Sequence, residues 1–229
     1  MRGSGELWVV NATSDPRPTQ VPLSIASISG VHTPVFSPDG NTIVFAYDAN
    51  GVSSLGRINV DGTNFRPLTS QSHYYAGPSF YSDGSAVLAA RGSTLNYTEL
   101  VRVDNTGLET VIASSLGTQA CAIANRVALA PNGAKVAFDA RTNPSLGCSG
   151  PVRIFVVDLA ARTVTRLTNY PADPLAQDGF PTWVGNDQVG YASDAAAGTN
   201  NVYSLQAALR DTSGALRVPT ASEPYYGPN

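Results

Sequence analysis

Aromatic and acidic side chains gather at a few points of this 229-residue sequence. The members of these groups are His73, Tyr74, Tyr75, Tyr170, Asp173, Gln177 and Asp178, with Tyr225 and Tyr226 near the end of the sequence. Aromatic rings beside carboxylates can bind a peptide, a sugar or a loop of a partner protein. The alternative is structural, with tyrosines packed between elements and aspartates capping turns. The predicted binding residues are His73, Tyr74, Tyr75, Tyr170, Asp173 and Asp178.

Catalysis finds little support in the residue pattern. The sequence has no Gly-x-Ser-x-Gly elbow, no Walker loop and no His-Glu-x-x-His motif. His32 and His73 are the only histidines, too few for a histidine-rich metal site, and His32 is expected to be a scaffold residue. The acid and base of a glycosidase would have to come from aspartates, for which no motif is present. We therefore expect a non-enzymatic protein without a cofactor.

The two cysteines, Cys121 and Cys148, match no zinc or redox motif. One interpretation is a single disulfide, which would place the protein in an oxidising compartment. The other is a pair of unrelated buried thiols.

Composition excludes two classes of partner. The formal net charge is −3, and Lys135 is the single lysine, so no basic stripe is available for a nucleic-acid backbone. The longest apolar run, 154–161, contains Asp158 and is far shorter than the roughly 20 residues of a membrane span. We expect neither nucleic-acid binding nor a membrane-spanning segment.

The elements that must position the candidate residues follow from an internal repeat. Its copies are 34–45, 78–89, 127–138 and 181–191, and a fifth begins at 224. They recur every 43 to 54 residues, the spacing of one four-stranded propeller blade.

Each copy contains a turn with a clear physical basis. In Ser37-Pro38-Asp39-Gly40, the proline sets the first corner, the aspartate can accept a bond from its own backbone, and the glycine takes the left-handed position. A third strand and an Arg-x-Leu-Thr outer strand complete the unit, as in 163–168. Many short antiparallel strands are predicted.

The Phe-Ser-Pro-Asp-Gly turn, the Val-Asp-Gly turn and the Arg-x-Leu-Thr strand resemble the TolB-type β-propeller repeat, a relative of the WD-repeat propellers. The resemblance implies an all-β propeller of four-stranded antiparallel blades over the whole chain. The predicted blades are 34–77, 78–126, 127–180 and 181–223, with a partial blade at 1–33 and the start of another at 224–229. The two ends either complete a fifth blade or belong to an arc of a six- to eight-bladed parent.

In such a blade the short hairpin turns lie on one face and the longer, variable loops on the other. The predicted binding residues and both cysteines fall in the variable loops, where binding concentrates on a rigid scaffold. We expect a periplasmic or extracellular propeller that binds a protein or peptide there. The alternatives are the gating propeller of a prolyl-oligopeptidase-like peptidase and a carbohydrate-binding propeller. A calcium ion in the central channel, held by Asp178, is a further possibility.

Overall fold

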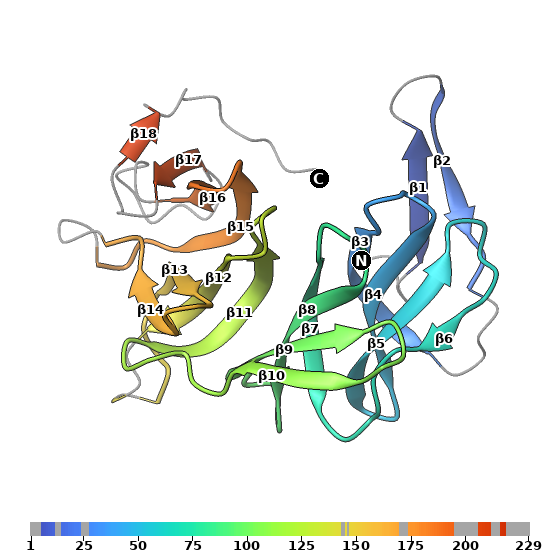
Figure 1. Ribbon diagram of the computed structural model, residues 1–229, viewed down its shortest axis with the longest axis horizontal. Helices are drawn as coiled ribbons and strands as arrows, with labels where there is room; N and C mark the ends of the chain where they lie inside the picture. The colour runs from blue at the N-terminus through green and yellow to red at the C-terminus, as the bar shows by residue number, and fades with distance from the viewer. Residues whose placement is uncertain are drawn as a thin grey trace.

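The structure is a computed structural model that describes residues 6–11, 15–23, 28–142, 145, 147–169, 174–194, 206–211 and 216–218. Eighteen β-strands lie in these residues (Figure 1). No helix in this part of the chain is long and apolar enough to cross a membrane.

The strands form five antiparallel sheets (Figure 1). A two-stranded sheet pairs β1 (Leu7–Asn11) with β2 (Asp15–Val21). The next sheet contains β3 (Ser29–Phe36), β4 (Thr42–Ala49), β5 (Val52–Asn59) and β6 (Arg66–Pro67). It is followed by β7 (Tyr74–Phe80), β8 (Ala86–Gly92), β9 (Glu99–Asp104) and β10 (Glu109–Ala113). The last two are β11 (Ala120–Leu129), β12 (Lys135–Thr142), β13 (Val152–Asp158) and β14 (Thr163–Arg166), then β15 (Asp178–Val184), β16 (Gln188–Ser193), β17 (Gln206–Asp211) and β18 (Leu216–Val218).

The sheets follow one another around an arc, which confirms the predicted β-propeller of four-stranded antiparallel blades. In the four complete sheets the strands pair in chain order. The first strands β7, β11 and β15 each pack against the sheet before them. β1–β2 and β15–β18 lie at the two ends of the arc (Figure 1). Residues 1–5 and 219–229 lie outside the described residues, so closure of a fifth blade by the two ends stays a prediction.

The inner strands begin before the repeat boundaries predicted from the sequence. β7 starts at Tyr74 and β15 at Asp178, whereas the corresponding repeats begin at 78 and 181. The segments 70–77, 118–126 and 170–180, which the repeat boundaries leave as variable loops between blades, therefore end in strand. The similarity between copies starts at the second half of each inner strand, because the residues of the first half differ from blade to blade.

The hairpin turns have the predicted geometry. Asp39 accepts a bond from the backbone N–H of Asn41 at 3.1 Å, and Asp83 accepts one from Ser85 at 2.9 Å. Hydrogen bonds from Ser37 and Asn41 lower the pKa of Asp39 below its ordinary value. Gly84 takes a φ of 69°, the left-handed position that the motif requires.

The Leu-Thr pair of the repeat caps the third strand of two blades. Leu68 N–H donates to the Leu55 carbonyl at 2.8 Å, and Thr69 Oγ1 accepts from Leu55 N–H at 3.0 Å. Thr168 does the same for Ile154 at 3.0 Å. The threonine thus satisfies a backbone donor beyond the point where the outer strand ends.

Thr168 makes one bond that Thr69 lacks, because its hydroxyl donates to Asp178 Oδ2 at 2.6 Å in a buried setting. We expect Thr168→Val to lower the free energy of unfolding by about 2–3 kcal/mol and Thr69→Val by about 1–2 kcal/mol. Urea denaturation of both variants measures the difference. Equal losses would show that the Thr168–Asp178 bond adds nothing.

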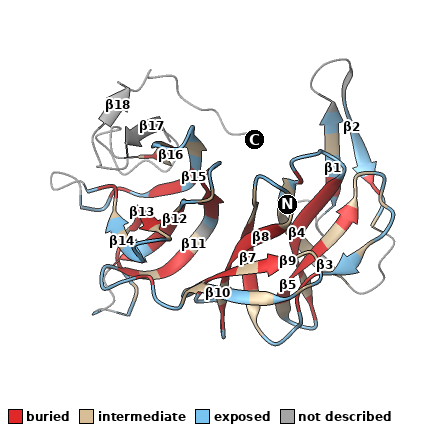
Figure 2. Ribbon diagram, viewed as in Figure 1, coloured by how far each residue is buried: buried red, intermediate tan, exposed pale blue. Residues whose placement is uncertain are grey.

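The core lies between neighbouring sheets (Figure 2). The second strands are the most buried: β4, β8 and β12 are red along most of their length in Figure 2. Phe45, Leu88 and Phe138 are fully buried in them. The apolar second strands therefore hold the blades together, and the first strands are left to face the middle of the arc.

Cys121 and Cys148 form a disulfide, so the first of the two predicted interpretations is confirmed. Cys121 lies near the start of β11, and Cys148 lies in the segment between β12 and β13. The bond therefore ties that segment to the inner strand of its own blade.

Candidate functional site

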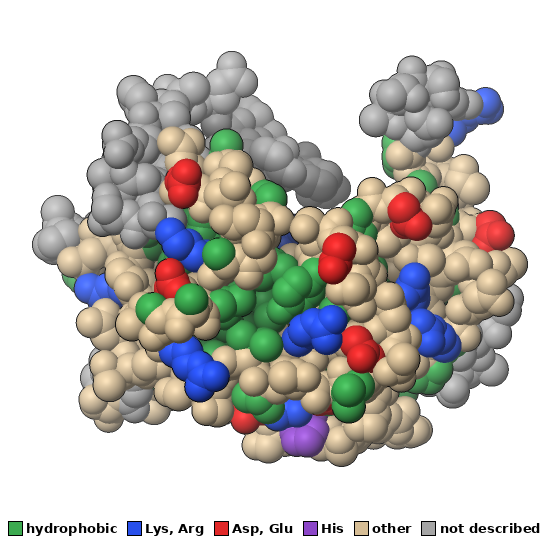
Figure 3. Space-filling model, viewed as in Figure 1, with side chains coloured by type: hydrophobic (Ala, Val, Ile, Leu, Met, Phe, Trp, Pro, Cys, Tyr) green, Lys and Arg blue, Asp and Glu red, His purple; other side chains and the backbone are tan. Residues whose placement is uncertain are grey.

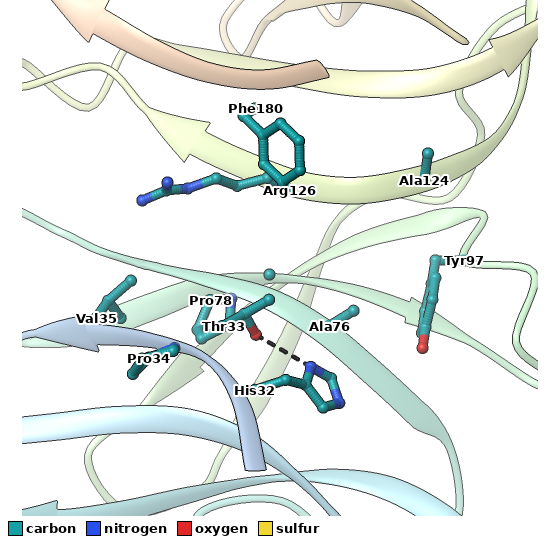
Figure 4. Close-up of a pocket in the computed structure, with 11 residues that line it drawn as sticks. His32, Thr33, Pro34, Val35, Ala76, Pro78, Tyr97, Ala124, Arg126 and Phe180 are labelled. Carbon is teal, nitrogen blue, oxygen red and sulfur yellow. Dashed lines mark hydrogen bonds between the residues drawn. The ribbon is translucent and has the colours of Figure 1, made fainter. Parts of the chain in front are cut away.

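A cavity of about 410 Å³ lies between the inner strands of the four complete blades (Figure 4). It is lined by His32, Thr33, Pro34, Val35, Ala76, Gly77, Pro78, Tyr97, Ala124, Arg126 and Phe180. Tyr97 comes from the β8–β9 loop, on the face that carries the longer loops. Figure 3 shows hydrophobic side chains gathered in the middle of the face in view. A cavity of this size and lining falls in the ordinary range of small-ligand sites, about 300–1,000 Å³.

Every inner strand is irregular where it passes the cavity. In β7, Ala76 pairs with Ala90 and Ser79 with Leu88, so two residues of β7 face a single residue of β8. β3 and β15 carry the same bulge, and that of β11 is longer. The bulge residues include Thr33, Gly77, Arg126 and Phe180, all of which line the cavity. Bulges re-aim side chains, and here the bulges of all four blades bring residues to the cavity.

Two of these bulge residues have a strained backbone. Thr33 has a φ of 47° and Phe180 a φ of 56°, in the left-handed region that branched and bulky side chains avoid. Such strain is typically of the order of 1–3 kcal/mol per residue. Burial does not offset it at Phe180, whose side chain remains 55% exposed. The bulge therefore presents an exposed aromatic ring to the cavity at a cost in backbone strain.

This strain gives a direct prediction. Phe180→Gly should be more stable than Phe180→Ala by about 1 kcal/mol, since only glycine adopts a positive φ freely. At Thr182, two residues along the same strand, alanine should be the more stable of the two replacements. Thermal unfolding of the four variants measures both differences. If alanine were also favoured at position 180, the strain would be absent.

A buried carboxylate holds two of the bulges in place. Asp139, on β12, is fully buried, and its two oxygens accept the backbone N–H groups of Arg126 at 2.9 Å and Phe180 at 3.0 Å. These donors belong to different blades. Asp139 therefore fixes the spacing between Arg126 and Phe180 without being part of the cavity lining.

Among its described lining residues, the cavity presents one cation against mainly apolar walls. Arg126 and Phe180 lie on one side, and His32, Thr33 and Pro78 face them across the space (Figure 4). Arg126 is exposed, and its guanidinium has no hydrogen-bond or ion-pair partner among the described residues. Tyr97 is nearly buried, and burial raises the pKa of its hydroxyl. The arrangement can bind an apolar group together with an anion.

The cavity lacks the pattern of a nucleophilic site. The Thr33 hydroxyl lies 3.5 Å from His32 Nδ1, at the outer limit of a hydrogen bond. No carboxylate among the described residues bonds the His32 ring, so the third member of a triad has no counterpart there. In the same part of the chain, no three His, Cys, Asp or Glu side chains converge in a way that could hold a metal ion.

Tyr75 was predicted to lie on an exposed binding loop, and the structure corrects this. It is fully buried in β7, and its hydroxyl donates to Glu109 Oε1 at 2.7 Å. Arg91 links Glu109 and Glu99, with 2.8 Å between the charged atoms of each pair. These side chains join all four strands of the blade. The role of Tyr75 is therefore structural.

Burial, followed by the bond to Glu109, raises the pKa of Tyr75 above its ordinary value near 10. Because the folded state favours the protonated phenol, this stabilisation is complete below about pH 10 and is lost as the pH rises further. We expect Tyr75→Phe to be about 1 kcal/mol less stable than the wild type at pH 8, with the gap shrinking toward pH 11. Urea titrations at a series of pH values test this. A gap that stays constant would contradict it.

The other predicted binding residues differ in burial and in whether they lie in a strand or a loop. Asp178 is buried in β15 and bonded to Thr168, so the exposed loop position expected for it was wrong. Tyr74 also belongs to β7 and packs partly buried against the core. His73 is half-buried, 3.0 Å from the Ser72 hydroxyl, with its ring against Tyr75. Tyr170 and Asp173 lie outside the described residues, as do Tyr225 and Tyr226.

Sequence reasoning missed Arg126, Phe180 and Asp139. Counted from the hairpins, Asp139 occupies the position of Ala46, Ala90 and Ala192 in the other blades. An alignment of the repeat copies shows a carboxylate at a strand position where the other three copies have alanine. That difference is a signal that could have drawn attention to Asp139.

Comparisons with known proteins show the fold. No family model matches the chain, and no curated protein matches it either. Among solved structures, a TolB protein from Agrobacterium tumefaciens matches with a TM-score of 0.70 and 20% identity, over 95% of this chain and 73% of that one. TolB from Acinetobacter baumannii matches with a TM-score of 0.67 and 17% identity, over 94% of this chain and 48% of that one. The chain is a TolB-like propeller in fold.

Enzymes match in the same way. An oligogalacturonate lyase from Vibrio parahaemolyticus has a TM-score of 0.60 and 16% identity, over 94% of this chain and 59% of the lyase. A prolyl endopeptidase has a TM-score of 0.58 and 13% identity, over 92% of this chain and 31% of the peptidase. At these identities the likeness concerns the fold alone.

Proposed function

We propose that this chain is a non-catalytic, extracytoplasmic β-propeller that binds a peptide, or a segment of a partner protein. The binding site is the cavity between the inner strands, here called the channel cavity. The observation that carries the proposal is Phe180, an exposed aromatic ring on a strained bulge, directed into a largely apolar cavity. Aromatic anchors in preformed pockets supply most of the free energy in peptide recognition.

Three further features support this function. The TolB-like fold provides a rigid scaffold for a site at its centre. Tyr97, from a loop on the face with the longer loops, is among the residues that line the cavity. The disulfide between Cys121 and Cys148 favours an oxidising compartment, because such bonds persist outside the reducing cytosol.

The test is selection from a pool of random heptapeptides on the immobilised protein, with the captured peptides sequenced by mass spectrometry. The wild type and Arg66→Gln, an exposed arginine on the outer strand β6, should enrich the same related peptides. Phe180→Gly should lose them. The function is rejected if the wild type enriches nothing, or if Phe180→Gly retains the same set.

A second candidate is the propeller of a larger peptidase, favoured by the match to a prolyl endopeptidase of which this chain covers 31%. The reading frame beyond Asn229 in the gene decides it. A hydrolase domain there would support the peptidase, and a stop codon would remove it.

A further inference from the structure

We infer that the channel cavity recognises a carboxylate next to an apolar side chain, as at the C-terminal end of a peptide, with Arg126 binding the carboxylate and Phe180 contacting the side chain. The inference rests on the peptide-binding function proposed above and names the ligand class of the same site.

The charge of the cavity carries the first step. Arg126 is the single charged residue among the described residues of the lining, and none of those lining residues is acidic. Its exposed guanidinium has no partner among the described side chains, and in Figure 4 it extends toward the side of the view on which Val35 lies. A guanidinium presents a planar set of donors that matches a carboxylate with two parallel hydrogen bonds. An anion is the complementary ligand group.

The second step concerns how the two contact residues are held. Arg126 belongs to β11 and Phe180 to β15, so nothing in a single strand fixes the distance between them. Asp139 does so by accepting both of their backbone N–H groups. The backbones of the two contact residues are thus held at a set separation before any ligand arrives, which reduces the entropy lost on binding. Asp139 is a positioning residue here.

The third step separates a peptide from an acidic sugar. A sugar ring carries many hydroxyl groups, and sites for it need a matching number of polar partners. The cavity walls are mostly apolar, and they offer Pro34, Val35, Ala76, Pro78 and Ala124. The polar side chains among the described lining residues are His32, Thr33, Tyr97 and Arg126. A single carboxylate beside a hydrocarbon or aromatic group fits this lining better.

The experiment compares small peptides by calorimetric titration into the whole protein. The first pair is acetyl-Ala-Ala-Phe with a free carboxylate and the same peptide with an amide end. We expect the free acid to bind about tenfold or more tightly than the amide. Arg126→Gln should remove that preference, because the affinity for the free acid should fall to about that of the amide. Arg66→Gln is the matched control and should behave as the wild type.

A third peptide, acetyl-Ala-Glu-Phe with an amide end, carries its carboxylate on a side chain. If it binds as the free acid does and depends on Arg126, the carboxylate is recognised from a side chain; if it binds as the plain amide does, the chain terminus is recognised. Asp139→Asn should weaken both members of the first pair, because its amide keeps one acceptor oxygen and replaces the other with a donor, which disturbs the spacing between Arg126 and Phe180.

Three results would overturn the inference. Equal affinity for the acid and the amide, both reduced by Phe180→Gly, would reject carboxylate recognition and leave the peptide-binding function standing. An acid preference that survives Arg126→Gln would assign the anion to another residue. No binding of any peptide, or binding of a trimer of galacturonic acid instead, would reject the inference and the peptide-binding function together.

Discussion

Asp139→Ala should lower the free energy of unfolding by about 2–5 kcal/mol. The substitution removes the acceptor of two backbone N–H groups, those of Arg126 and Phe180, at a site with no exposure to water. A buried donor left without a partner typically costs about 1–3 kcal/mol. The loss should appear as a lower urea midpoint with an unchanged slope.

Asp158 provides a matched control, because it also accepts two backbone N–H groups, from Ala160 and Ala161. Those bonds lie in an exposed turn where water can replace the carboxylate. Asp158→Ala should therefore cost less than about 1 kcal/mol. Similar losses for the two variants would show that Asp139 has no special role in joining the blades.

Removing the disulfide should lower the free energy of unfolding by an amount similar to that expected for Asp139→Ala. Cys121 and Cys148 are 27 residues apart, and closing a loop of that length restricts the unfolded chain by about 3.5 kcal/mol in the chain-entropy description. We expect the double variant Cys121→Ala, Cys148→Ala to lose about that much stability in urea. Reduction of the wild type should produce the same loss, and the double variant should not respond to reductant.

A thiol titration of the denatured, unreduced protein checks the premise. The disulfide predicts no reactive thiol. Two reactive thiols in protein purified from the cells that naturally produce it would contradict both the disulfide and the proposed extracytoplasmic location.

Most of the fold could be predicted from the sequence, because each hairpin is determined by residues that are close together in the chain. Pro38, Asp39 and Gly40 specify one turn through local backbone geometry and a side-chain hydrogen bond of Asp39, and the same chemistry recurs near Gly84. The Leu-Thr pair was recognised as part of a strand, but its function as a cap depends on Leu55 and Ile154, which only the folded blade brings into contact.

The first halves of the inner strands could not be read in the same way. A Gly77-Pro78 or Thr33-Pro34 pair is typical of a loop, since proline removes a ladder donor and glycine favours turns. In the fold these pairs are bulges of a strand at the sheet edge, where the missing N–H has little effect. Tyr75 was placed on a loop for this reason.

The candidate site was missed because its residues are contributed by separate blades. No motif in the sequence marks Arg126 or Phe180. The folded chain links them through the hydrogen bonds that their backbone N–H groups donate to Asp139. The clusters His73-Tyr74-Tyr75 and Asp178 were visible, but burial and hydrogen bonds give Tyr75 and Asp178 structural roles. Residue type was therefore a weaker guide to the site than the departure of one repeat from the others.

The affinity of a selected peptide for the wild type and for Phe180→Gly tests the central claim most directly. The variant should fold at least as stably as Phe180→Ala, since glycine relieves the positive φ, and yet bind the peptide at least tenfold more weakly. Unchanged affinity in a folded Phe180→Gly protein would contradict the assignment of the channel cavity as the binding site.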